Sequence, residues 1–155
     1  MKRILSFVLM ALIIFTVSSC GEAKVKDFKL SDISDELNQK VEFSELFPMS
    51  SDDLFQDTGI NESMYKDSVM LIPTDSLLAN RMFFFEAVDS DKAAFIEKKL
   101  KNYLEQQKVA SQDYSPEMYA VFNKASVVRS GNYVHLVVVD EISEAKKIID
   151  KFELK

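Results

Sequence analysis

The feature that most constrains the fold is a stretch, 82–88, that is apolar on both faces of an extended chain. Because successive side chains of a strand point to opposite faces, one face carries Phe83, Phe85 and Ala87, and the other carries Met82, Phe84 and Val88. Such a strand is central in its sheet and covered on both sides, unless one of the faces is a binding surface. We expect it to be the centre of the core.

Further strands are predicted on either side of this stretch. The run 69–72 is apolar and is ended by Pro73. Segments 126–129 and 133–139 flank a short turn in which Gly131 and Asn132 can both take the positive φ that hairpin turns require. These patterns predict one strand before 82–88 and a β-hairpin after it.

The helices are indicated by apolar residues at spacings of three and four. The first such series lies at the start of the domain and consists of Leu30, Ile33, Leu37 and Val41. We predict further helices at about 91–109, 116–124 and 141–152, and the second of these has Ser115 as its N-cap and Pro116 at its first position. The prediction is a single small α+β domain: two strands, two helices, a C-terminal β-hairpin and a helix. Helices pack on an approximately four-stranded, mainly antiparallel sheet.

The N-terminus has the pattern of a targeting signal. Lys2 and Arg3 precede an apolar run to Val17 that is shorter than the roughly 20 residues of a spanning helix. The segment 17–20, Val-Ser-Ser-Cys, resembles the lipobox of bacterial lipoproteins. This resemblance implies cleavage before Cys20 and a lipid on its sulfur. An ordinary signal peptide with a chance cysteine and an uncleaved anchor are the alternatives.

The resulting organisation is a signal peptide at 1–19, a lipidated cysteine and tether at 20–29, and a globular domain at 30–155. The lipid on Cys20 would hold the domain on the outer, extracytoplasmic face of the cell membrane, since two or three acyl chains anchor stably.

Charge and cysteine content exclude several classes of function. Removing 1–19 takes two positive charges from the formal net charge of −6 and leaves −8. A balance this acidic disfavours nucleic acid as a partner. Cys20 is the single cysteine, so its lipidation leaves no disulfide, thiolate nucleophile or cysteine metal site. We predict no metal and no cofactor.

No arrangement of catalytic residues stands out, so a binding or accessory module is the first hypothesis. Its partner would be an envelope protein or a small ligand, and Tyr114, Tyr119 and Tyr133 are the candidate contact residues, although a core position is favoured for them. The alternative is a small hydrolase acting on the cell wall or on peptides. A Ser-His-Asp triad would then have to include His135, whose place in an apolar strand favours a structural role.

Several short motifs between residues 54 and 152 resemble one family. They are Leu54-Phe55, Gly59-Ile60 and Tyr65, the strand 80–89, Gln107, the segment 114–119 (Tyr-Ser-Pro-Glu-Met-Tyr), and Gly131-Asn132-Tyr133-Val134 running into Val137-Val138. Together they are similar to the Gram-positive lipoprotein family catalogued as domain of unknown function 4358. The resemblance implies an intact fold and a surface location. It carries no catalytic residue and no ligand.

Overall fold

The computed structural model describes residues 28–154. The predicted signal peptide, Cys20 and most of the predicted tether lie outside these residues. Within this range there are five α-helices: α2 (Leu30–Lys40), α3 (Ser51–Thr58), α4 (Ser90–Gln112), α5 (Pro116–Lys124) and α6 (Ile142–Lys151). The strands are β1 (Leu46–Pro48), β2 (Tyr65–Pro73), β3 (Arg81–Ala87), β4 (Val127–Ser130) and β5 (Tyr133–Val138), and a short 3-10 helix, η1 (Glu62–Met64), precedes β2.

The strands form one antiparallel sheet in the order β1-β2-β3-β5-β4. The predicted α+β class with a mainly antiparallel sheet is confirmed, and the described strands number five instead of about four. The additional strand is β1, which pairs Leu46 with Pro73 and Pro48 with Leu71. It is too short to show an alternating pattern, and its proline is tolerated because the strand lies at the edge of the sheet.

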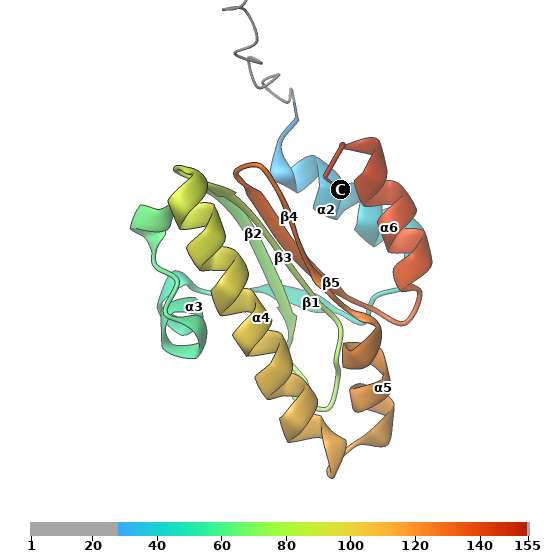
Figure 1. Ribbon diagram of the computed structural model, residues 1–155. Coiled ribbons are helices and arrows are strands. Elements are labelled where there is room, and N and C mark those ends of the chain that lie inside the picture. The colour runs from blue at the N-terminus through green and yellow to red at the C-terminus, as the bar shows by residue number, and fades with distance from the viewer. Residues whose placement is uncertain (1–27, 155) are drawn as a thin grey trace, which may run out of the picture.

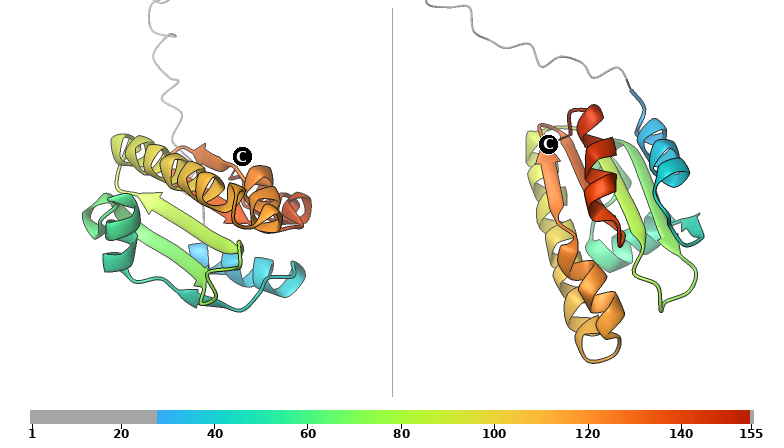
Figure 2. Two further views of the ribbon diagram at one scale, coloured as in Figure 1. Left: turned by 90° about the horizontal axis from the view of Figure 1, so that it is seen from below. Right: turned by 90° about the vertical axis from the view of Figure 1, so that its right-hand side faces the viewer.

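Helices cover both faces of the sheet, as Figure 1 and Figure 2 show. Phe83 and Phe85 of β3 belong to the core beneath α4 and α5, which also includes Leu54 of α3. Met82 and Phe84 belong to a second core beneath α2 and α6. These four side chains of β3 are completely buried. The expectation that stretch 82–88 is central and covered on both sides is therefore confirmed.

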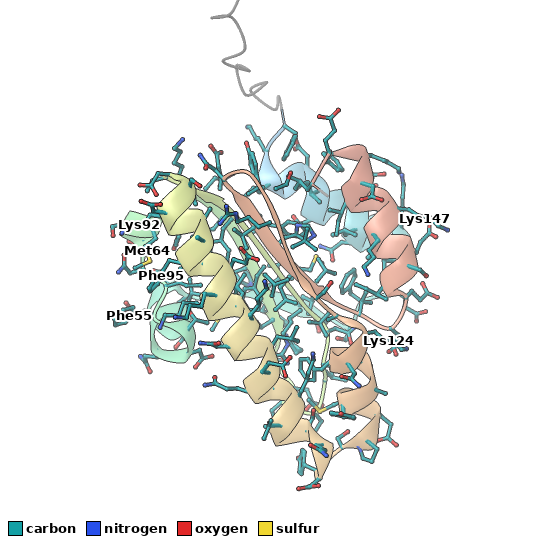
Figure 3. All side chains as sticks on the ribbon, viewed as in Figure 1. Phe55, Met64, Lys92, Phe95, Lys124 and Lys147 are labelled. Carbon is teal, nitrogen blue, oxygen red and sulfur yellow. The ribbon has the colours of Figure 1, made fainter. Side chains whose placement is uncertain are left out.

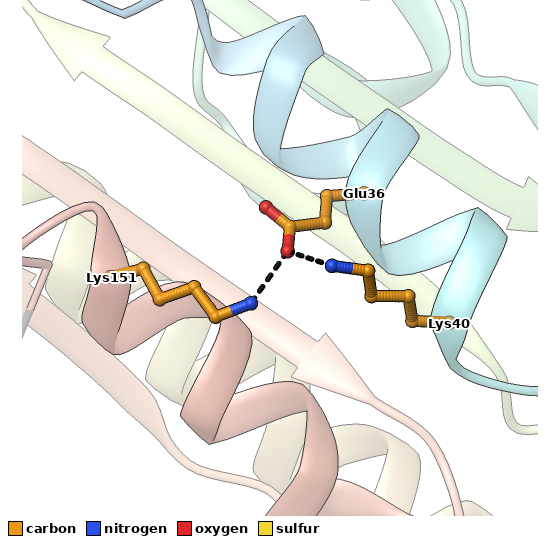
Figure 4. A network of polar contacts seen from close by, with 3 residues as sticks. All are labelled: Glu36, Lys40 and Lys151. Carbon is orange, nitrogen blue, oxygen red and sulfur yellow. Dashed lines mark hydrogen bonds and ion pairs between the residues drawn. The ribbon is translucent and has the colours of Figure 1, made fainter.

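The layer on the second face is made by the two ends of the described chain. Helices α2 and α6 lie side by side, and Lys151 of α6 contacts Glu36 of α2 at 2.6 Å (Figure 4). Lys40 reaches the same carboxylate oxygen at 2.5 Å, and hydrogen bonds from Lys151 and Lys40 hold the pKa of Glu36 below its usual value. Phe28, within the predicted tether, packs edge-on against Phe152 with ring centroids 5.3 Å apart.

Caps and turns begin and end the elements where the sequence indicates. Ser115 is the N-cap of α5 and accepts a hydrogen bond from the Met118 amide at 3.3 Å, with Pro116 at the first helical position. In the turn between β4 and β5, Gly131 takes φ +63°. Asn132 does not have positive φ, so this turn uses the left-handed region at the glycine only, where it is sterically free.

Candidate functional site

A pocket of about 170 Å³ lies between α6 and the strands β4 and β5. Its apolar wall is formed by Val128, Val137, Ile142, Ile149 and Leu154. Its polar groups are Ser126, His135, Lys146 and Asp150. We call it the α6 pocket. Because β4 is the edge strand of the sheet, the pocket lies beside the sheet margin, beneath one helix.

His135 is placed in this pocket by the alternation of β5. Its neighbours Val134 and Leu136 belong to the core beneath α4, so His135 points to the α6 side, and its cross-strand partners are Phe84 and Val128. The imidazole stacks on the Phe84 ring with centroids 5.5 Å apart and is 6% exposed. Among the described residues its Nδ1 has no hydrogen-bond partner.

Burial controls the protonation of His135. Loss of hydration lowers its pKa from 6.5 to about 4, and the charge of Asp150 opposes this shift only in part. The ring is therefore neutral near pH 7, with one nitrogen that donates a hydrogen bond and one that accepts. The other buried side-chain polar atom without a partner in the described part of the chain is Ser44 Oγ, which does not line this pocket.

Ser126, His135 and Asp150 bring the three residue types of a hydrolytic triad into one pocket. In such a triad the aspartate accepts a hydrogen bond from histidine Nδ1. Nδ1 of His135 has no such bond to any residue from 28 to 154. The residues share a pocket but are not assembled into a triad.

A buried cation elsewhere in the molecule has a structural explanation. Arg81, 7% exposed, donates from Nε to the Ala79 carbonyl at 2.9 Å and from Nη2 to the Leu78 carbonyl at 3.3 Å. Its Nη1 donates to the Tyr103 hydroxyl and to Gln107, and the guanidinium lies 4.8 Å from the Phe122 ring centroid. The side chain thus fastens the segment before β3 to α4, and most of its donors are occupied.

A second hollow, of about 300 Å³, lies between α3 and α4 and includes Phe55, Lys99 and Tyr103. Phe55 and Phe95 project on this side of the molecule in Figure 3, and Lys99 Nζ lies 5.2 Å from the Phe95 ring centroid. Tyr103 has its pKa raised, mainly by burial. The α6 pocket is the better candidate site because it combines apolar walls with His135, whose buried Nδ1 has no partner in the described part of the chain.

The three candidate contact tyrosines do not gather at one place. Tyr114 is exposed beyond the end of α4, and Tyr119 is half-buried in α5. Tyr133 is the first residue of β5, directly after the hairpin turn, and its ring centroid lies 5.6 Å from that of Phe28. Contact of these residues with a ligand or partner stays a prediction, as does lipidation of Cys20, which lies outside the described residues.

The sequence pattern placed His135 on a strand face but missed Ser126, Lys146 and Asp150. The spacing of apolar residues in α6 indicates its buried stripe, but the residues at the margin of that stripe depend on how the helix docks.

In the described range, no three His, Cys, Asp or Glu side chains are grouped to hold a metal ion. None of the described helices is long and apolar enough to cross a membrane.

Comparison with known proteins finds a family and no characterised relative. A family model described as a domain of unknown function (DUF4358) matches residues 39–139. No curated protein and no solved structure matches the chain. The match covers the sheet together with α3, α4 and α5, whereas α6, which forms one wall of the α6 pocket, follows it.

Proposed function

The chain belongs to the DUF4358 family, and we propose that it is a binding protein whose ligand site is the α6 pocket. In this proposal a lipid on Cys20 holds the domain at the outer face of the cell membrane. The family's description assigns no activity, and the residues of this chain alone support the proposed binding function.

The observation that carries the proposal is a small apolar pocket lined by His135, whose buried Nδ1 has no hydrogen-bond partner among residues 28–154. A buried polar atom left without a hydrogen bond costs about 1–3 kcal/mol. Where native proteins retain such an atom, a water, an ion or a ligand commonly supplies the missing partner. A small molecule with an alkyl portion and a hydrogen-bonding group would satisfy both the apolar wall and the imidazole.

The pocket is tested with 3-methylbutan-1-ol, which has a branched alkyl group and a hydroxyl. The full-length chain in detergent is titrated with this probe while NMR follows the ring resonances of His135. We expect saturable shifts that are lost in Val128→Phe, which fills the pocket. Val127→Phe is the matched control, since its side chain lies on the other face of β4. Absence of saturable shifts, or equal binding by both variants, would refute the proposed site.

The anchor is tested separately by cell fractionation. Cys20→Ala removes the sulfur that would carry the lipid, so the variant should leave the detergent-soluble membrane fraction in which the wild-type chain is expected. Chemical crosslinking on intact cells that carry the wild-type chain or Cys20→Ala tests whether an envelope protein is the partner. Equal membrane retention of both forms, together with a wild-type Cys20 that carries no acyl mass, would contradict lipid anchoring.

A hydrolase is the second candidate function, because Ser126, His135 and Asp150 line one pocket. Catalytic hydrogen bonds are often long in a free enzyme and shorten when substrate binds. An acyl ester such as p-nitrophenyl acetate is a suitable first substrate. Loss of turnover in His135→Ala and in Ser126→Ala, with unchanged melting temperature, would support this candidate. Turnover that is absent in the wild type, or retained in both variants, would exclude it.

A further inference from the structure

The charged residues of α6 divide into two groups by their partners. Lys147 forms an ion pair with Glu144 at 2.8 Å, and Lys151 forms one with Glu36 at 2.6 Å. In Figure 3, Lys147 lies on the outer side of α6, away from the sheet. Lys146 and Asp150 have no ion-pair partner within the described residues. These two unpaired residues are the charged groups of the α6 pocket.

Lys146 and Asp150 are one helical turn apart and face the same side of α6. At this spacing the two Cβ atoms are about 5–6 Å apart, yet no contact within the ion-pair distance joins the two charges in the structure of residues 28–154. The pocket therefore presents a separate cation and anion at its rim, an apolar wall, and the neutral imidazole of His135. The net charge of the whole site is zero.

We infer that the α6 pocket takes a free amino acid, bound as its zwitterion, with a short branched apolar side chain. This inference rests on the proposed binding function. The carboxylate of the ligand pairs with the Lys146 ammonium, and the ligand ammonium pairs with the Asp150 carboxylate. A ligand with one charge alone would leave the opposite charge of the pocket unmatched.

Size and polarity select the side chain of the ligand. A volume of about 170 Å³ has room for about six water molecules at ~30 Å³ each, which suits a ligand of few atoms. Val128, Val137 and Ile149 line the interior, where a polar side chain would lose its hydration without gaining partners. His135 lines the same pocket, where its imidazole can share in binding a polar end of the ligand.

The test compares L-leucine with analogues that lack one charge. Isothermal titration of the full-length chain in detergent measures the dissociation constants of L-leucine, 3-methylbutylamine and 4-methylpentanoate. We expect L-leucine to bind at least about tenfold more tightly than either analogue, because charge-assisted hydrogen bonds are the strong ones. Lys146→Gln and Asp150→Asn should each weaken leucine binding by about tenfold or more. Both residues are exposed, so neither substitution threatens the fold.

Matched controls are Lys147→Gln and Glu144→Gln, which alter charges of the same helix outside the pocket and should leave leucine binding unchanged. Equal affinity for leucine and both analogues, or unaltered leucine binding by Lys146→Gln and Asp150→Asn, would overturn the inference that the ligand binds as a zwitterion. If 3-methylbutan-1-ol binds and leucine does not, the amino-acid inference fails while the proposed binding function stands. If neither compound binds, both fail.

Discussion

At the scale of the residue, His135 is the group whose chemistry the fold changes most. It is 6% exposed, stacks on Phe84, and has its pKa lowered to about 4 by burial. The pKa of His135 in the folded chain thus lies below its ordinary value of 6.5. Between pH 6.5 and pH 4 the imidazole is therefore protonated in the unfolded chain but stays neutral in the folded chain. His135 therefore opposes folding more strongly as the pH falls through this range.

We predict that the unfolding free energy of the wild type decreases from about pH 6.5 to about pH 4 more steeply than that of His135→Phe. The difference should reach roughly 3 kcal/mol at most, since each pKa unit corresponds to about 1.36 kcal/mol. Above pH 6.5 the contribution of His135 is independent of pH. Urea denaturation at a series of pH values measures both curves, and parallel curves over this range would contradict the assignment.

At the scale of the element, side chains just before the helices supply the hydrogen bonds that the first turns lack. Asp89 Oδ1 accepts from the Lys92 amide at 2.7 Å at the start of α4, and Ser50 Oγ accepts from the Asp53 amide at 3.1 Å at the start of α3. At the end of α3, Gly59 takes φ +75° and its amide donates to the Phe55 carbonyl at 2.7 Å. These local bonds set the bounds of the helices before any packing is considered.

We predict that Asp89→Ala lowers the unfolding free energy by about 1 kcal/mol, because the Lys92 amide loses its acceptor. Asp89→Asn keeps an acceptor oxygen in place and should lose only a few tenths of that amount. Thermal or urea unfolding of the three proteins at neutral pH makes the comparison. If Asp89→Asn and Asp89→Ala lowered the unfolding free energy equally, α4 would require the negative charge of Asp89 and not its hydrogen bond to the Lys92 amide.

At the scale of the whole molecule, one sheet supports two separate layers of helices. Ile96 of α4 and Ile148 of α6 are both buried, on opposite sides of the sheet. The two cores share β3, whose Met82 and Phe84 face one layer while Phe83 and Phe85 face the other. Neither layer can therefore lose its packing without exposing one face of the same central strand.

We predict that Ile96→Ala and Ile148→Ala each lower the unfolding free energy by about 2–5 kcal/mol through a single cooperative transition. Amide hydrogen exchange should show the loss of protection in the slowest amides of β3 in both variants. If Ile148→Ala loosened α2 and α6 alone while β3 kept its protection, the two layers would unfold independently.

Four of the five described α-helices and the central position of stretch 82–88 were readable from the sequence, because both depend on local patterns; α3 was not predicted as a helix. Alternation along 82–88 requires apolar cover on two sides, and Ser115 with Pro116 places the start of α5 without reference to distant residues. The same holds for the hairpin around Gly131. Strand β1 was not readable, since its three residues carry too few positions for a period of two and are held by pairing with β2.

The α6 pocket was decided by the tertiary structure alone. Ser126 and His135 come together through the pairing of β4 with β5, and Lys146 and Asp150 join them because α6 docks on the face that carries His135. The apolar stripe of α6 requires only that this helix cover some apolar surface. The way in which α6 docks decides which of its charged residues border the pocket. That docking is set by the shapes of Phe84, Val137 and the other residues beneath the helix.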